Sequence, residues 1–148
     1  MAGGRLSVQV VRLDPELSLP AYAHPGDAGI DLLARRAVVL RAGGGRALVY
    51  TGVAVRIPEG FGGLVLPRSG LAARHGVTVL NAPGLIDAGY RDEIGVLLLN
   101  TDPDEDYGVR RGDRIAQLVV VAVEEITWHP VASLGGGDRG GGFGHSGR

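Results

Sequence analysis

Residues 81–100, NAPGLIDAGYRDEIGVLLLN, carry the strongest structural signal in this chain. Proline and glycine supply turn chemistry in the first half, and Val96 begins a short apolar run that is typical of a buried strand. The composition predicts a β-hairpin. A lone carboxylate, Asp87, lies on its turn between apolar residues and Tyr90.

Asp87 has two explanations at this point. A carboxylate held on a tight turn beside an aromatic ring can position a water molecule while backbone groups contact a flat ligand. A solvated turn aspartate, which is common in an Asp-x-Gly sequence, explains the same residues. The rest of the chain decides between them.

Length and composition indicate one globular domain. The chain has 148 residues, 45% of them hydrophobic, and a formal net charge of −1. These values argue against disorder and against binding to a nucleic-acid backbone. The absence of cysteine excludes a disulfide framework, a thiolate metal site and a catalytic thiol. The N-terminus has no long apolar segment and no run approaches about 18 apolar residues, so we expect a cytoplasmic protein without a membrane span.

Short apolar segments recur along the chain at the spacing of an all-β sandwich or barrel. The polar run DPDEDYGVRRGD, residues 102–113, is expected to be a solvated loop. The expected strands cover residues 6–11, 30–33, 38–40, 46–49, 53–57, 77–80, 115–123 and 127–131.

One short helix is expected within PRSGLAARHG, residues 67–76. Ser69 can cap a single turn over residues 71–74, which Gly76 can end. The helix N-terminus would present backbone amides beside Arg68 and the Ser69 hydroxyl, an arrangement that suits an anion such as phosphate.

Two polar residues, Asp31 and Gln117, interrupt apolar strands. A buried polar side chain needs hydrogen-bond partners. For Gln117, satisfying backbone groups and contacting a ligand are equally good explanations.

The last segment, GGGDRGGGFGHSGR at residues 135–148, is too rich in glycine to form regular structure unaided. By itself it predicts a flexible tail. Its Arg139 and Phe143 also suit a flap, since an arginine can reach a terminal phosphate and a phenyl ring can stack on a base. We therefore divide the chain into a β domain, residues 1–134, and a C-terminal flap, residues 135–148.

Five ordered segments resemble the five motifs of the homotrimeric dUTP diphosphatases. They are AGIDLLA (28–34), PRSGLAARHG (67–76), GLIDAGYRDEI (84–94), RGDRIAQLV (111–119) and RGGGFGHSG (139–147). The resemblance implies a jelly-roll-like β-sandwich or distorted barrel with one short helix, assembled as a homotrimer whose sites are shared between subunits. It also implies Mg²⁺-assisted hydrolysis of dUTP to dUMP and pyrophosphate, which limits uracil in DNA and supplies dUMP for dTMP synthesis. Stable binding to nucleic acid or membrane is not expected.

The resemblance also implies roles for individual residues. Asp87 would orient the water that attacks the α-phosphorus, and Tyr90 would pack under the deoxyribose and leave no space for a 2′-hydroxyl. Asp31 would support the phosphate and Mg²⁺ region indirectly, through water, while the triphosphate itself holds most of the metal. The uracil pocket would be formed by Asn81, Leu85, Ile86 and the backbone of Gly95. The phosphates would meet Arg68, Ser69, Gly70, Gln117 and, from the tail, Arg139, while Phe143 stacks on uracil and Ser146 keeps a tail contact.

Three positions depart from the family pattern. Asp92 stands where glycine is common, Gly95 where a larger side chain is common, and His145 where serine or threonine is usual. We expect these changes to alter affinity modestly and to leave activity intact.

Two other functions are considered. The related dCTP deaminases use a glutamate about ten residues beyond the aspartate of the hairpin, where this chain has apolar Leu97, and this disfavours deamination. A β-sandwich that binds nucleotides or proteins without catalysis is the second alternative, and the joint presence of Asp87, Tyr90, Arg139 and Phe143 argues against it.

Overall fold

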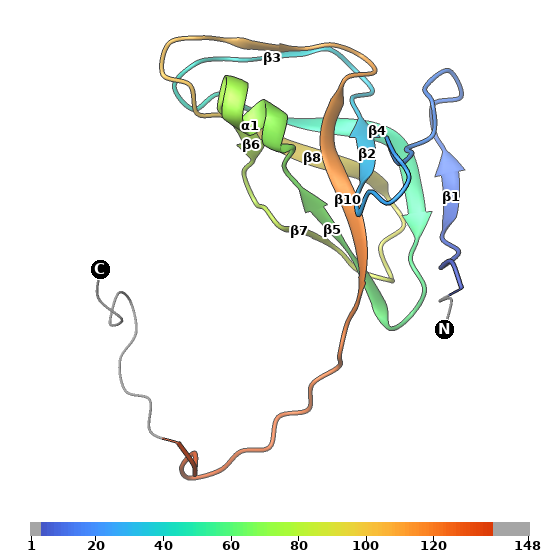
Figure 1. Ribbon diagram of the computed structural model, residues 1–148, viewed down its shortest axis with the longest axis vertical. Coiled ribbons are helices and arrows are strands. Elements are labelled where there is room, and N and C mark those ends of the chain that lie inside the picture. Colours follow the sequence, from blue (N-terminus) through green and yellow to red (C-terminus); the bar gives the residue numbers. More distant parts are fainter. Residues whose placement is uncertain (1–3, 138–148) are drawn as a thin grey trace.

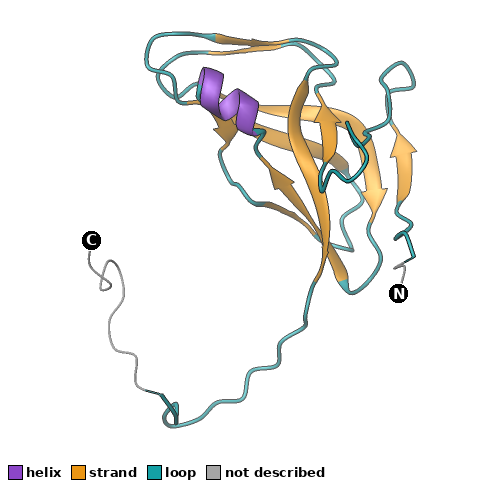
Figure 2. Cartoon of the chain, in the orientation of Figure 1, coloured by secondary structure: helices purple, strands orange, loops and turns teal. Residues whose placement is uncertain are grey.

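The computed structural model describes residues 4–137 of the chain, which form ten strands and one helix (Figures 1 and 2). The tail residues Arg139, Phe143 and Ser146 lie outside this described part, and so does His145. The expected all-β class with one short helix is confirmed.

Two four-stranded sheets pack face to face, and every neighbouring pair of strands within them is antiparallel. The first sheet has the order β1 (Gln9–Arg12), β4 (Arg46–Arg56), β8 (Glu93–Asn100), β6 (Val77–Val79). The second has the order β2 (Ile30–Leu33), β10 (Arg114–Ala122), β5 (Phe61–Leu66), β7 (Gly84–Ile86). A two-stranded ribbon joins β3 (Val38–Leu40) to β9 (Tyr107–Val109).

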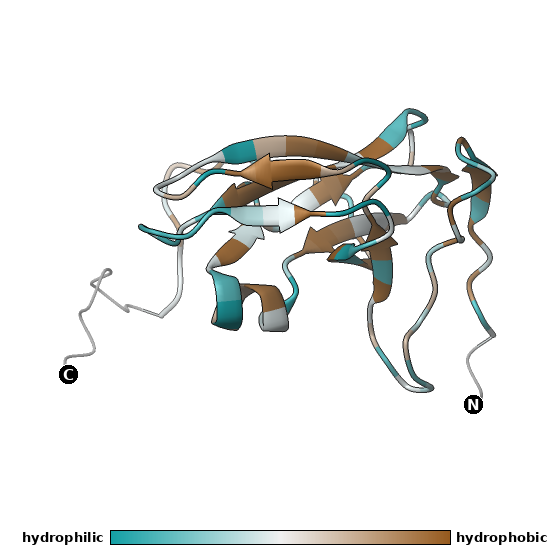
Figure 3. Ribbon diagram, turned by 90° about the horizontal axis from the view of Figure 1, so that it is seen from above, coloured by the Kyte–Doolittle hydropathy of each residue, from teal (hydrophilic) through white to brown (hydrophobic). Residues whose placement is uncertain are grey.

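The core forms between the two sheets because their strands alternate. Along β8, Ile94, Val96 and Leu98 are buried, while the residues between them are only half-buried. Val65 of β5 and Leu118 of β10 belong to the same buried cluster from the opposite sheet. Each such side chain contributes about 1.5–3 kcal/mol through burial. Figure 3 shows the hydrophobic residues gathered in the strands and the hydrophilic ones in the loops.

A bulge joins two segments that the sequence predicts as separate strands. Residues 46–49 and 53–57 fall largely in one strand, β4, whose pairing with β8 shifts register between Tyr50 and Ala54. Gly52 sits inside this bulge with φ +73°, a conformation that other residues rarely adopt. Glycine here therefore bends the strand without ending it.

The predicted hairpin in residues 81–100 is wrong. Strand β7 pairs with β5, whereas β8 pairs with β4 and β6 in the other sheet. β4 pairs along one edge of β8, and β6 pairs with the other edge only at Leu98–Asn100, so the earlier part of that edge has no strand partner and borders a gap toward β7. The chain crosses between the sheets over residues 87–92, through a turn in which the Tyr90 N–H donates to the Asp87 carbonyl at 3.0 Å.

Three other local predictions change. Residues 127–131 form no strand, and the Trp128 side chain is 83% exposed on an extended segment that leaves the body after β10 (Figure 1). The expected loop of residues 102–113 contains β9, because β3 offers it an antiparallel partner. Strand β1 begins at Gln9, later than expected, and all four of its residues are exposed.

The helix α1 (Ser69–His75) begins one residue earlier than its predicted cap allows. Arg68 occupies the N-cap position, and no side chain makes a capping hydrogen bond there, so the capping role of Ser69 is wrong. Gly76 ends the helix in the left-handed conformation with φ 63°, as predicted. Within the described residues, no helix is long and apolar enough to cross a membrane.

Candidate active site

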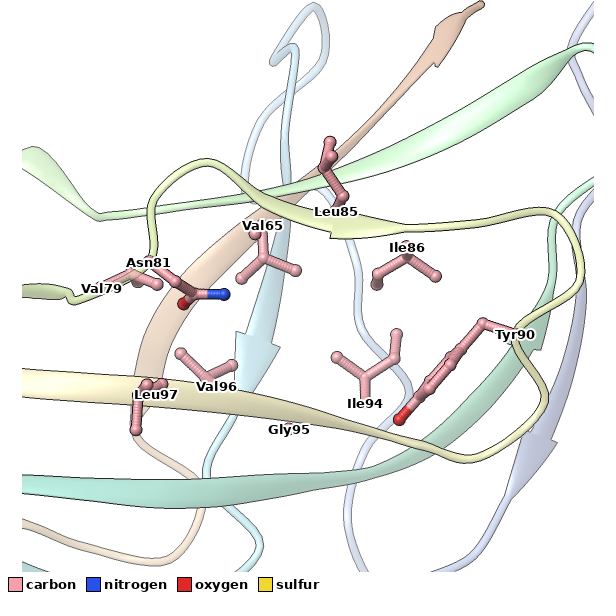
Figure 4. Close-up of a pocket in the computed structure, with 11 residues that line it drawn as sticks. Val65, Val79, Asn81, Leu85, Ile86, Tyr90, Ile94, Gly95, Val96 and Leu97 are labelled. Carbon is pink, nitrogen blue, oxygen red and sulfur yellow. The ribbon is translucent and has the colours of Figure 1, made fainter.

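An apolar cavity of about 150 Å³ opens between β7 and β8 (Figure 4). Its walls come from both sheets because β7 and β8 belong to different sheets. The side chains of Val65, Ile86, Ile94 and Val96 are buried and approach one another across it. Val79 and Leu97 complete the apolar lining. Such a cavity suits a flat, weakly polar ring.

Polar groups border this cavity at its two ends. The Asn81 amide lies at one end and the Tyr90 ring at the other (Figure 4), and Gly84 and Gly95 contribute backbone. Leu85 also lines the cavity, yet its side chain is 75% exposed and points away, so its contribution is main-chain. A ring in the cavity would therefore meet one side-chain amide and several peptide groups. This arrangement allows the main chain to recognise the polar edge of the ring.

Tyr90 is held at both ends. Its backbone N–H donates to the Asp87 carbonyl, and its hydroxyl donates to the Glu93 carbonyl at 2.9 Å. Burial raises the pKa of Tyr90, and the charge of Asp92 raises it further. The phenol therefore stays protonated and keeps its hydrogen bond over the neutral range.

Asp87 directly follows β7, one residue beyond the cavity-lining Ile86. Its side chain is exposed, and within residues 4–137 it has no hydrogen bond or ion pair. It does not line the cavity. An exposed carboxylate free of partners can accept a proton or hydrogen bond from water next to a ligand in the cavity.

A second, polar hollow of about 270 Å³ lies where β2 and β10 meet the start of α1. Five predicted site residues line it together: Asp31, Arg68, Ser69, Gly70 and Gln117. The neighbouring residues Asp27 and Gly29, which the sequence reasoning missed, line it as well. The Arg68 guanidinium and the polar side chains beside it can contact an anion, and one carboxylate of the hollow pairs with both Arg68 and the nearby Arg114.

Asp31 is that carboxylate. Its Oδ1 lies 3.2 Å from the Arg68 Nε, and its Oδ2 lies 3.7 Å from the Arg114 Nε. Arg68 also donates to the Arg114 carbonyl at 3.1 Å. Asp31 thus fixes the direction of Arg68, and this ion pairing explains a carboxylate within an apolar strand.

Gln117 has the backbone partner that one of its two explanations requires, and it lies where a ligand contact can form. Its Nε2 donates to the Pro67 carbonyl at 2.9 Å, so it supports the chain just before the Arg68–Gly70 segment. The side chain also lines the polar hollow. Gly29 lies so close that a Cβ there would be 2.6 Å from the Gln117 Oε1, and the missing side chain leaves room for the glutamine.

The predicted site residues therefore fall in two groups. Asn81, Leu85, Ile86, Tyr90 and Gly95 line the apolar cavity, with Asp87 adjoining it, and the Asp31 group lines the polar hollow. Within the described part of the chain, no residue lines both. The apolar lining residues Val65, Val79, Ile94 and Val96 were not identified from the sequence, because burial patterns alone do not separate a cavity wall from the core.

No three His, Asp or Glu side chains among residues 4–137 gather closely enough to hold a metal ion. Asp31 is the carboxylate beside the guanidinium groups, and both of its oxygens already face arginines. These donors fit a cation that is held by the phosphates of a ligand and touched by the chain through water. They do not form a protein-built metal site.

The fold and the two cavities define an all-β protein with room for a flat ring and polar contacts for an anionic group. Comparison with known proteins gives the family. The dUTPase family model matches residues 16–147. A deoxyuridine 5′-triphosphate nucleotidohydrolase from Thermobifida fusca is 57% identical over 145 residues, which cover 97% of this chain and 80% of that protein. One from Rhodococcus erythropolis is 52% identical over 143 residues, 96% of this chain and 87% of that protein.

Solved structures agree. A mutant dUTPase of Staphylococcus bacteriophage 80alpha, solved with dUpNHpp, superposes with a TM-score of 0.85 at 30% identity, covering 95% of this chain and 98% of that chain. A mutant dUTPase from phage phi11 of S. aureus, described with a structural Mg(II) ion, gives 0.78 at 28% identity over 86% of this chain and 97% of that chain. The chain belongs to the dUTPase family. The expected enzyme class, dUTP diphosphatase, is confirmed.

Proposed function

We propose that this chain hydrolyses dUTP to dUMP and pyrophosphate, with the uracil and sugar in the cavity between β7 and β8. The observation that carries the proposal is that cavity itself. It is apolar, it has room for a flat ring, and its ends hold the Asn81 amide and the Tyr90 ring. Cytosine presents a donor where uracil presents an acceptor, so peptide groups and one amide in fixed positions can separate the two bases.

Asp87 is the proposed catalytic carboxylate. It adjoins the cavity at the end that carries Tyr90, and it has no described partner to compete for water. A water held by this carboxylate would attack the α-phosphorus, the carboxylate would accept the proton, and the bond to pyrophosphate would break. Tyr90 would pack against the sugar and exclude a 2′-hydroxyl.

The triphosphate is proposed to meet the Arg68–Gly70 segment and Gln117, with Arg139 and Phe143 closing over the nucleotide from the 135–148 flap. Mg²⁺ chelated by the phosphate oxygens would offset the charge that develops on pyrophosphate. Asp31 would contact that region through water while it holds Arg68 in place. Deleting residues 138–148 should leave the melting temperature within about 3 °C, because every core residue among residues 4–137 is kept, and should slow hydrolysis about tenfold or more.

A homotrimer is proposed as the working form. The apolar cavity and the polar hollow share no described residue, and a nucleoside triphosphate needs both kinds of contact. Several large apolar side chains are also exposed on residues 123–134, including Ile126, Trp128 and Leu134, which favours their burial against another copy. Light scattering at micromolar concentration tests this, and a monomeric mass would contradict it.

The activity is tested by incubating purified protein with dUTP, dCTP and UTP, each with and without Mg²⁺. We expect dUMP and pyrophosphate from dUTP, a strong dependence on Mg²⁺, and little turnover of the other two nucleotides. Release of ammonia from dCTP would favour a deaminase, and binding without any product would favour a non-catalytic protein. In the cell, the reaction is proposed to take place in the cytoplasm, to limit uracil incorporation into DNA and to supply dUMP for dTMP synthesis.

A further inference from the structure

Glu93, the first residue of β8, connects the apolar cavity to two other parts of the fold. Its side chain is only 16% exposed, and both carboxylate oxygens are used. Oε2 lies 2.8 Å from the Arg35 Nη1, and Oε1 accepts from the Gly52 N–H at 2.7 Å. Its own carbonyl accepts the Tyr90 hydroxyl at 2.9 Å. One residue therefore holds the ring at the cavity, the β4 bulge and the segment after β2.

The β4 bulge depends on this carboxylate. Gly52 is buried, and its N–H falls where the β4–β8 ladder is interrupted, so the amide would have no strand partner. Glu93 supplies the acceptor, and the Thr51 hydroxyl donates to the Ile94 carbonyl at 2.8 Å beside it. The bulge and the first two residues of β8 are thus fixed to each other. Bulges beside binding sites commonly re-aim nearby side chains in this way.

Glu93 is the last member of a row of side chains with alternating charges. Arg35 lies 3.5 Å from Asp14 through its Nε and also donates to the Leu13 carbonyl at 3.0 Å. Asp14 in turn accepts hydrogen bonds from both terminal nitrogens of Arg111. The row Arg111, Asp14, Arg35, Glu93 runs from the turn before β10 to the cavity. Asp14 is paired with an arginine on each side, so its side chain is held in place more firmly than it would be in a single surface ion pair.

Tyr90 is the cavity residue that this row reaches. Its ring forms one end of the cavity, and its hydroxyl bond to the Glu93 carbonyl is the only hydrogen bond of its side chain within residues 4–137. The backbone of Tyr90 lies on the crossing turn between the two sheets, so this bond is what ties the tip of the ring to β8. Its position therefore depends on where the start of β8 is held.

We propose that Glu93 is a positioning residue for Tyr90: by fixing the start of β8 through Arg35 and Gly52, it holds the ring closed against the sugar and so sets the preference for deoxyribose over ribose. This inference rests on the proposed function of the cavity. Glu93 touches no substrate, and its effect is transmitted through the ring.

The test is the ratio of kcat/KM for dUTP to kcat/KM for UTP in Glu93→Gln. Glutamine keeps an acceptor for Gly52 but removes the charge that binds Arg35. We expect the ratio to fall about fivefold or more, through a higher KM for dUTP and faster UTP turnover, while kcat for dUTP changes less than about threefold because Asp87 is untouched. Isothermal calorimetry with dUMP and UMP reads the same preference without hydrolysis.

Asp106→Asn is the matched control. Asp106 also joins an arginine, Arg41 at 2.6 Å, to a backbone N–H, that of Ala42 at 2.8 Å, and none of these three residues lines the cavity. This variant should change the melting temperature without changing the dUTP to UTP ratio. A Glu93→Gln protein that loses stability like the control and keeps the ratio within about twofold of wild type would overturn the inference.

Changes at Arg35 and Tyr90 keep the test decisive if Glu93→Gln folds poorly. Arg35→Lys retains the positive charge and should keep most of the preference, whereas Arg35→Met should lower it. Tyr90→Phe removes only the hydroxyl bond to Glu93, and its combination with Arg35→Met should lower the ratio less than the product of the two single effects, because both act through one ring. Full additivity would contradict the inference. A wild-type protein that does not cleave dUTP would instead refute the proposed function, and the dUMP and UMP affinities would still judge the role of Glu93.

Discussion

Replacing Asp87 with asparagine should separate catalysis from stability cleanly. The Asp87 side chain is exposed and has no hydrogen bond or ion pair within residues 4–137, so an isosteric amide removes no described contact. The free energy of unfolding should change by no more than about 0.5 kcal/mol, which moves the melting temperature by about 2 °C at most. Loss of a general base typically costs about 10²–10⁴-fold, or about 2.7–5.4 kcal/mol of activation free energy.

The assay is kcat at saturating dUTP from pyrophosphate release, with the dUMP dissociation constant from calorimetry and the melting temperature from the same preparations. We expect kcat to fall about 100-fold or more while dUMP affinity stays within about threefold. Asp92→Asn is the control, since Asp92 is an exposed aspartate five residues further along the crossing turn. Turnover near the wild-type value in Asp87→Asn, or an equal loss in both variants, would show that the turn carboxylate is not the base.

Three other changes test separate parts of the structure. Gly29→Ala would place a Cβ 2.6 Å from the Gln117 Oε1, so the glutamine must move and KM for dUTP should rise about tenfold, and an unchanged KM would remove Gln117 from the phosphate site. Asn100→Ala deletes the three hydrogen bonds of a fully buried side chain and should cost about 3 kcal/mol, read as a fall of about 6–12 °C in the melting temperature. The hydrogen bond from Arg111 holds the pKa of Asp14 well below its usual range, so this pair stabilises the fold above about pH 4 and its contribution fades as the pH falls further. Asp14→Asn should therefore melt lower than wild type at pH 6, with a smaller difference at pH 3, and a gap that widens in acid would contradict this sign.

The strands and the helix end were predictable where a local pattern decides them. The alternation in β8 marks its buried face, and Gly76 ends α1 because glycine readily adopts the left-handed conformation. Pairing was not predictable, because it depends on partners distant in the chain. Strand β9 lies in a polar run that becomes a strand only beside β3, and the apolar residues around Trp128 alternate as a strand would but have no neighbour within the described chain.

Sequence motifs identified the candidate site residues, but they did not predict which other residues hold them in place. Asp31 and Gln117 stood out because a polar group in an apolar strand requires a reason, and the structure supplies arginine and backbone partners. The dependence of Tyr90 on Glu93 has no local signal. The carboxylate contacts Arg35 and Gly52, which are 58 and 41 residues away, and only the folded chain brings them together.

The incorrect hairpin explains why a cavity exists where the motif predicted a site. Strands paired in a hairpin lie about 4.8 Å apart, and their facing side chains leave no space for a ring between them. Sheets packed face to face are about 10 Å apart, so strands that separate into opposite sheets can hold a ring between them. Gly84 on β7 and Gly95 on β8 line this gap with main-chain atoms, and the crossing turn between these strands carries Asp87 and Tyr90. The same departure from local pairing therefore opens the cavity and brings the carboxylate and the ring to its end.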